Sequence, residues 1–191
     1  MNTRKKLAEL ADLSSGVHLR AAPVAEGDTY YLTGKLFDER GAPVSELWKP
    51  TVVIDGRLER HRLKDNDLLL FAKGLHHRVL HYRSEYGPAV ASTLFMVLRI
   101  KVADLLPAYL HWYLNDPQTQ SELSRMARGS GIPSLSKKAL QMLRVPVPTI
   151  DTQRNILRGH RLWQQQQQVY EKLIETKRTL YQQQLLELAG N

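Results

Sequence analysis

Basic side chains and histidines gather in one short segment of this sequence, at Lys73, His76, His77 and Arg78. A lysine, two imidazoles and a guanidinium can contact phosphates, and they can donate hydrogen bonds to the acceptor edge of guanine. The segment lies between two runs of residues typical of strands, so we expect a loop that binds DNA. The alternative is an exposed hairpin without a ligand.

A second group of basic and hydroxyl residues surrounds a Gly-Ser-Gly segment further along the chain. Its members are Arg125, Arg128, Ser130, Lys137 and Lys138. The glycines have no side chain to hold a phosphate backbone away, so the group is suited to binding DNA phosphates. We predict that this connection clamps the phosphate backbone, and its residues are the second group of candidate DNA contacts after the first segment.

Acidic residues offer a different chemistry, because carboxylates and imidazoles are common metal ligands. Asp65 and Asp67 precede the two histidines, but their spacing matches no metal motif, and a turn before a strand accounts for them. Glu175 and Lys177 are two residues apart on a predicted helix and do not share a face. We predict no metal site, and a small metal-dependent nuclease that uses Asp65, Asp67 or the histidines stays open as an alternative.

Other catalytic centres find little support in the sequence. The chain has no cysteine, which excludes disulfides, cysteine-based zinc sites and thiol nucleophiles. No phosphate-binding glycine loop occurs, and Asn115–Gln118 lacks the second proline and the aromatic residue of an adenine methyltransferase loop. We therefore expect a non-catalytic protein that needs no cofactor.

Charge and hydropathy indicate where such a protein acts. The formal net charge of +8 suits a polyanionic partner such as nucleic acid. The longest apolar run, Ala89–Ile100, is far shorter than the roughly 20 residues of a membrane helix, and no signal peptide precedes it. We expect a cytoplasmic protein with no membrane partner.

The elements that position these residues change in kind along the chain. Short apolar runs bounded by Gly, Pro, Asp and Asn predict strands at Tyr30–Thr33, Val52–Ile54, Leu68–Phe71 and Ala89–Leu98. The first part of the chain is therefore rich in sheet.

Helical periodicity follows this part. Apolar residues three and four apart predict an amphipathic helix over Asp104–Leu114, and Asp116 is placed to cap a second helix through about Ala127. A short helix fits within Ser134–Leu143. Two prolines then keep Val145–Pro148 extended. We place the domain boundary there, after residue 148.

Residues 149–191 form the second predicted domain, a single long helix. Apolar doublets recur at heptad spacing along it, and their stripe includes Trp163, Val169, Tyr170, Leu173, Leu180 and Tyr181. At 1.5 Å per residue the helix extends about 55 Å, more than a body of this size covers. The stripe therefore requires a partner helix in a coiled coil, and a homodimer is the simplest arrangement.

Five segments, taken in chain order, match a pattern known from one protein family. They are Leu7–Gly16, Asn66–Gly74, Leu105–Leu110, Gly129–Leu135 and Leu143–Ile156. This order resembles one repeat of the specificity (S) subunits of type I restriction-modification systems. The last three segments are the most specific, and the final one has a proline pair, the glutamine Gln153 and an isoleucine similar to those that end a recognition domain in that family.

The resemblance implies an α+β (mixed) target recognition domain at residues 1–148, followed by a helix that sets spacing and binds methyltransferase subunits. The implied partners are double-stranded DNA, a modification methyltransferase and a restriction subunit. Family members usually carry two recognition domains and two helices, whereas this sequence has one of each. It therefore resembles a half-subunit, and two copies paired through antiparallel helices would read a bipartite, palindromic site.

Two further alternatives to this function remain. One is a stand-alone DNA-binding regulator or phage-defence accessory that works without a methyltransferase. The other is a coiled-coil scaffold whose basic body binds acidic proteins.

Overall fold

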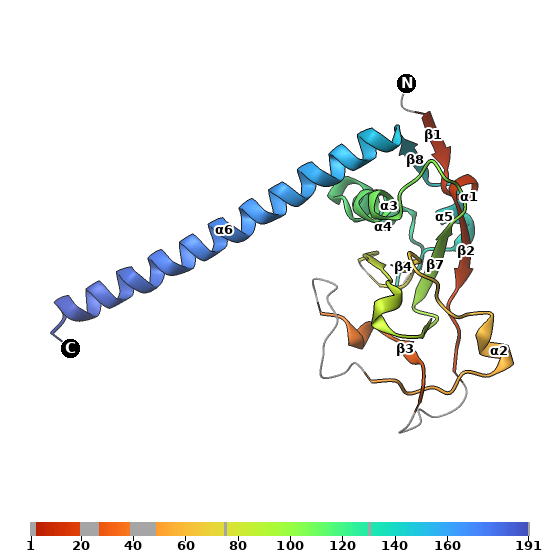
Figure 1. Cartoon of the computed structure of the whole chain (residues 1–191), viewed down its shortest axis with the longest axis horizontal. Helices are drawn as coiled ribbons and strands as arrows, with labels where there is room; N and C mark the ends of the chain where they lie inside the picture. The colour runs from red at the N-terminus through yellow and green to blue at the C-terminus, as the bar shows by residue number, and fades with distance from the viewer. Residues whose placement is uncertain (1–2, 20–26, 39–48, 75, 130, 191) are drawn as a thin grey trace. The chain divides into compact units, whose positions relative to one another are not determined.

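The computed structural model describes residues 3–19, 27–38, 49–74, 76–129 and 131–190 (Figure 1). Its contacts divide the chain into two compact units, Met1–Ile150 and Asp151–Asn191. The first unit holds the strands and short helices, and the second consists of the rest of a long helix. Each unit is described here by itself.

A four-stranded antiparallel sheet forms the centre of the first unit, in the order β2 (Ala11–Ser15), β7 (Phe95–Ile100), β4 (Leu68–Phe71) and β5 (Val79–His81). Leu68 of β4 lies opposite Leu98 of β7, and the two side chains are fully buried. The predicted strand Leu68–Phe71 is confirmed. Its continuous apolar run is explained by its place in the middle of the sheet, between β7 and β5.

Two strand pairs flank this sheet. β1 (Thr3–Lys6) pairs with β8 (Arg144–Val147) in antiparallel fashion, and β3 (Tyr30–Leu32) pairs with β6 (Ala89–Ala91) in parallel. The prediction of one strand over Ala89–Leu98 was wrong, because a turn closed by a hydrogen bond from Phe95 N to Ser92 O (3.0 Å) separates β6 from β7.

The predicted strand Val52–Ile54 is also wrong. Of its residues, Val52 alone forms a bridge, to Thr29. Asp28 lies beside it, and its carboxylate accepts hydrogen bonds from Thr29 Oγ1 (2.7 Å) and Ile54 N (3.3 Å). The segment is therefore tied down by local bonds and does not join a ladder.

Short helices connect the strands. They are α1 (Leu7–Leu10), α2 (Gly56–Glu59), α3 (Pro107–Asn115), α4 (Pro117–Met126) and α5 (Lys137–Gln141), with 3-10 turns at Gly34–Leu36 and Ser84–Tyr86. Asp116 caps α4 as predicted, since its carboxylate accepts hydrogen bonds from the backbone of Gln118 (2.9 Å) and Thr119 (3.4 Å). The predicted helix over 104–114 begins later, at Pro107, because proline is favoured in the first helical turn.

The core of the first unit packs on the central sheet. Leu32, Leu69, Phe95 and Val97 belong to one buried cluster. Phe71 covers Phe95 edge to face, with ring centroids 4.6 Å apart. The core therefore joins β3 to the central strands and fixes both ends of the connection between β4 and β5.

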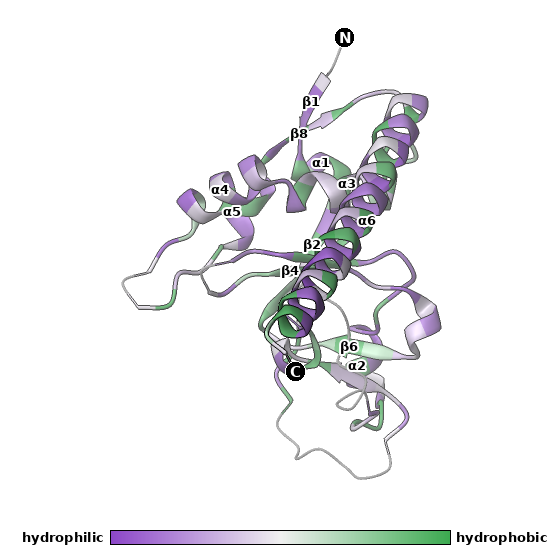
Figure 2. Ribbon diagram, turned by 90° about the vertical axis from the view of Figure 1, so that its left-hand side faces the viewer, coloured by the Kyte–Doolittle hydropathy of each residue, from purple (hydrophilic) through white to green (hydrophobic). Residues whose placement is uncertain are grey.

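The second unit continues α6, which covers Ile150–Leu188 and spans about 58 Å at 1.5 Å per residue. Figure 2 shows hydrophobic and hydrophilic residues alternating along its turns. The six predicted stripe residues, Trp163, Val169, Tyr170, Leu173, Leu180 and Tyr181, are all exposed. The predicted fold class, a mixed α and β body followed by a long helix, is confirmed. Among the described residues, no helix is both long and apolar enough to cross a membrane.

Candidate nucleic-acid interface

The connection between β4 and β5 carries the first predicted basic group. Phe71 N donates to Arg78 O (2.9 Å) across its base. Lys73 and His76 are exposed, and the half-buried Arg78 donates from Nη1 to the carbonyl of Asp38 (3.1 Å). Lys73 and His76 are thus available to a ligand, while Arg78 already holds one backbone contact.

His77 lies elsewhere, and its assignment as a DNA-contacting residue has to be corrected. Its side chain is fully buried, and Nδ1 lies 2.9 Å from the carbonyl of Phe71. A carbonyl only accepts, so Nδ1 carries the proton in this pair. The ring holds the β4–β5 connection from the protein interior, and a buried ring does not reach a DNA groove. The candidate set therefore keeps Lys73, His76 and Arg78.

The connection between α4 and α5 carries the second basic group. Arg125 is exposed in the last turn of α4, and Arg128 exchanges two backbone hydrogen bonds with Ser134 (3.0 and 2.8 Å). Lys137 and Lys138 are exposed in the first turn of α5. Ser130, a predicted member of this group, lies outside the described residues.

Backbone hydrogen bonds join the two basic groups into one surface. Gly74 N donates to Pro133 O (3.0 Å), and Leu135 N donates to Ala72 O (2.8 Å), so Lys73 pairs with Ser134. The two connections are about 60 residues apart in sequence and are joined by an isolated antiparallel β-bridge. Residues that the sequence presented as two separate groups therefore belong to a single site, which we call the joined-loop surface: Lys73, His76, Arg78, Arg125, Arg128, Lys137 and Lys138.

The charges of the joined-loop surface are available to a ligand. In the described part of the chain, the ion pairs involve other cations: Lys5, Arg62, Arg99, Lys101 and Arg154. Lys73, Arg125, Arg128, Lys137 and Lys138 form none of these pairs. Unpaired, exposed cations that cluster on two rigidly joined loops suit the phosphates of a nucleic acid.

Two polar side chains that the sequence did not single out hold this surface in place. Gln120 of α4 donates from Nε2 to the carbonyls of His77 (2.9 Å) and Leu114 (2.6 Å). The Asn115 carboxamide accepts from Val79 N (3.0 Å) and donates to Val79 O (2.9 Å). Polar residues next to a helix junction are ordinary in a sequence, and no pattern marked these two. Asn115, in the segment Asn115–Gln118, therefore has a structural role, because it ties the junction of α3 and α4 to β5.

The acidic residues considered for a metal site are occupied by structural contacts. Asp65 accepts from Ser84 N (2.9 Å), which lowers the pKa of its carboxyl. Asp67 accepts from Lys64 N (2.8 Å) and binds Arg99 through both oxygens (2.8 and 2.6 Å). The turn predicted for these residues is present, since Asp67 N donates to Lys64 O (3.0 Å). Within the described ranges, no three potential metal ligands lie together.

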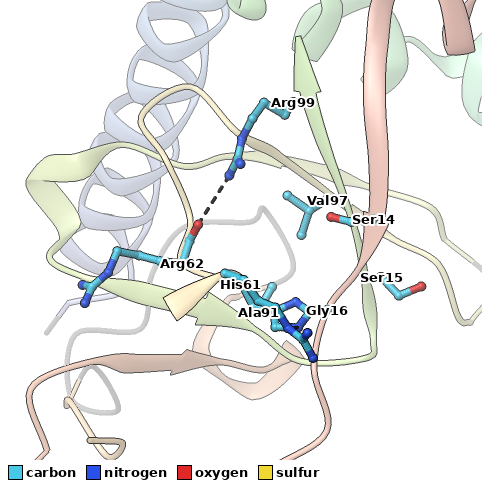
Figure 3. A pocket seen from close by; sticks show the side chains of 9 residues that line it. Ser14, Ser15, Gly16, His61, Arg62, Ala91, Val97 and Arg99 are labelled. Carbon is cyan, nitrogen blue, oxygen red and sulfur yellow. Dashed lines mark hydrogen bonds between the residues drawn. The ribbon is translucent and has the colours of Figure 1, made fainter. Parts of the chain in front are cut away.

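A basic hollow, separate from the joined-loop surface, lies beside β2 and β7, and Figure 3 shows the side chains that line it. Ser14, Ser15, His61, Arg62 and Arg99 contribute to a cavity of about 30 Å³, the size of a single water molecule. Arg99 donates to the backbone oxygen of Arg62 (3.4 Å).

Two of the three arginines that line this hollow are neutralised by ion pairs, whereas Arg60 forms none of the ion pairs found among the described residues. Arg62 binds Glu59 through both oxygens (2.8 and 2.9 Å), and Arg99 binds Asp67. Burial and the neighbouring Arg60 lower the pKa of His61, so its ring is neutral near pH 7. Compared with the joined-loop surface, this hollow offers little free charge, and its contacts hold the sheet to the segment before β4.

No family model matches this sequence, and the comparison with curated proteins finds no match. Solved structures do match. The chain superposes on the type I restriction-modification S subunit of M. genitalium with a TM-score of 0.61 at 17% identity, over 93% of this chain and 42% of that one. It superposes on the HsdS subunit of Thermoanaerobacter tengcongensis with a TM-score of 0.61 at 18% identity, over 86% of this chain and 37% of that one.

A third chain, from a structure of the type I restriction-modification system, gives a TM-score of 0.59 at 19% identity and covers 86% of this chain. The present chain spans about two fifths of the length of these proteins. Its structural neighbours are therefore S subunits, and the fold that it shares with them is a sheet-containing body followed by a long helix.

Proposed function

We propose that this chain recognises a DNA sequence as a specificity subunit of a type I restriction-modification system. The observation that carries the proposal is the joined-loop surface, where exposed and unpaired cations from two distant segments are held together by backbone hydrogen bonds. We assign Lys73 and His76, which are exposed, to base edges, and we assign Arg125, Arg128, Lys137 and Lys138 to phosphates that fix the register on the duplex. The fold shared with S subunits supports the same function.

The proposed division of labour follows the domains predicted from the sequence. Residues 1–148 bind double-stranded DNA, and residues 149–191 bind protein. The exposed apolar stripe of α6 supports a coiled coil with a second copy, since large apolar residues repeated along about 58 Å of helix are costly to leave in water. A paired helix would also carry the methyltransferase and restriction subunits, which supply the catalysis. In this role the chain needs no cofactor and acts in the cytoplasm, where the DNA is.

Selection from a randomised DNA duplex tests the proposal. We expect the chain, with its cognate methyltransferase subunit, to enrich a bipartite sequence at moderate salt. Enrichment only with the methyltransferase supports a subunit role, whereas the same enrichment by the chain alone favours a stand-alone binder. If neither preparation enriches a sequence, the proposed function is wrong.

The salt dependence of affinity tests the assignment of phosphate contacts. Each phosphate contact that is removed reduces the slope of log K against log salt by about 1. We expect this change for Arg128→Gln, with nearly uniform weakening over all duplexes. Arg158→Gln on the exposed face of α6 is the matched control, and its slope should stay at the wild-type value.

Pairing through α6 is tested by changing charge on opposite helix faces. Leu173 and Leu180 are seven residues apart and share the apolar face, while Gln168 and Gln182 lie on the opposite side. The double change of Leu173 and Leu180 to lysine should convert a dimer to a monomer in light scattering. The double change of Gln168 and Gln182 to lysine adds the same charge and should leave the dimer intact. A wild-type chain that is monomeric at micromolar concentration refutes self-pairing.

A further inference from the structure

One apolar side chain stands out within the joined-loop surface. Ile132 is 74% exposed, more than Val53 (59%) or Met142 (55%), the other large exposed hydrophobic residues described in the first unit. Neither the predicted phosphate contacts nor the core accounts for it. A β-branched apolar residue this open to water, next to exposed cations, is available to a ligand that has an apolar part.

The backbone around Ile132 is held in place on both sides. Gly129 has a φ of +132°, and a Cβ built there would lie 3.0 Å from Ile132 O, so the turn closes tightly against this carbonyl. The next residue, Pro133, accepts a hydrogen bond from Gly74 N (3.0 Å) and restricts Ile132 to extended conformations. The backbone of Ile132 is therefore restricted by Pro133 and its hydrogen bond.

The surroundings of Ile132 indicate what it contacts. Its segment begins at Arg128 and is paired with Lys73, and both side chains are exposed and unpaired in the described residues. These exposed cations favour a polyanionic ligand. A DNA groove has the complementary arrangement, with phosphates along its edges and base edges in its floor.

We propose that Ile132 contacts the 5-methyl group of a thymine in the major groove and thereby determines specificity at one position of the target. The thymine methyl is the apolar group that the major groove displays, and small apolar side chains recognise it by contact. A Cβ built on Gly131 meets nothing within 4 Å, so the approach to Ile132 is open on this side. The inference rests on the proposed function, because it adds one base contact to that same surface.

The contact is tested by removing the methyl group from the thymine or the apolar side chain from Ile132. With the sequence enriched by the wild-type chain, each thymine is replaced in turn by deoxyuridine, which lacks only this methyl. We expect one replacement to weaken binding about fourfold, the effect of one buried methyl-sized group. Ile132→Ala should lose a similar factor on the thymine duplex and show no further loss on the deoxyuridine duplex. Val53→Ala, an exposed apolar position outside the joined-loop surface, is the control and should behave like the wild type.

Each result decides the matter. If Ile132→Ala retains both the wild-type affinity and the deoxyuridine effect, the assignment of Ile132 is wrong while the proposed function stands. If a fluorescent 2-aminopurine unstacks on binding to the wild type and not to Ile132→Ala, the residue acts as a wedge between bases, and the methyl contact is refuted. If the wild type enriches no sequence, the proposed function fails first, and the inference falls with it.

Discussion

Asn115 offers the sharpest test of how the joined-loop surface is supported. β5 is the edge strand of the central sheet, and an edge strand has backbone groups that no neighbouring strand satisfies. The Asn115 carboxamide takes that place, because it accepts from Val79 N (3.0 Å) and donates to Val79 O (2.9 Å). A second donation, to His111 O (3.0 Å), keeps the carboxamide fixed on the end of α3. Asn115→Ala removes all three hydrogen bonds at once.

The expected cost follows from the burial of the groups that lose their partners. Val79 is 1% exposed, so its N–H and C=O are left in a largely dry site. Each lost hydrogen bond costs about 1 kcal/mol net, and an unsatisfied buried group costs about 1–3 kcal/mol. Because Asn115 itself is only half-buried, water reaches part of the gap. We expect Asn115→Ala to lower the free energy of unfolding by about 2–3 kcal/mol, or the Tm by about 4–12 °C.

Urea unfolding measured by circular dichroism checks this value, with Asn155→Ala as the matched control. Asn155 is exposed on α6, so the same substitution there should change stability by less than about 0.5 kcal/mol. The reasoning is refuted if Asn115→Ala and Asn155→Ala unfold at the same urea concentration with the same m-value. DNA affinity provides a second measurement, since loss of the anchor should displace the loop after β4 and thereby weaken binding.

Three further predictions concern other contacts. Asp67→Asn should lower the free energy of unfolding by about 2 kcal/mol, because it weakens a bidentate pair in which the Asp67 carboxylate is 1% exposed and Arg99 is 37% exposed; urea unfolding measures it. Burial, with a smaller effect of a nearby arginine, lowers the pKa of His81 from its usual 6.5. The stability that depends on neutral His81 is therefore present above pH 6.5 and is lost as pH falls through the folded-state pKa. His81→Gln should flatten the plot of the urea midpoint against pH. Gly129→Ala should lower the free energy of unfolding in urea by about 1–3 kcal/mol, because its φ of +132° strains an alanine, whereas Gly131→Ala, where a Cβ meets nothing within 4 Å, should unfold like the wild type.

Local signals in the sequence predicted much of the fold. The apolar run of β4, the Asp116 cap of α4 and the heptad spacing of apolar residues along α6 each depend on neighbouring residues only, and each predicted element is confirmed. β1 and β2 were missed, because β1 is a polar run, Thr3–Lys6, and its pairing with β8 joins segments about 140 residues apart. Such pairings leave no periodic mark in the sequence.

The candidate site shows the same limit more clearly. Residue type identified Lys73, Arg125 and Arg128 as candidates, but it could not distinguish the exposed His76 from the buried His77. The two histidines are adjacent, and in an extended backbone successive side chains point to opposite sides, so one turns outward and the other inward. Only the tertiary structure decides which of the two faces solvent.

The support of the joined-loop surface separates two kinds of residue that mutagenesis would otherwise confuse. Gln120 and His77 bind the loop from inside the body, whereas Lys73 and Arg128 project from it. Loss of an internal contact lowers both stability and affinity, because the loops are displaced when their anchors are lost. Loss of an external cation leaves stability unchanged and lowers affinity in a salt-dependent way. A DNA-contacting residue is therefore identified by the combination of a changed salt slope with an unchanged urea midpoint, and the loss of affinity alone does not identify it.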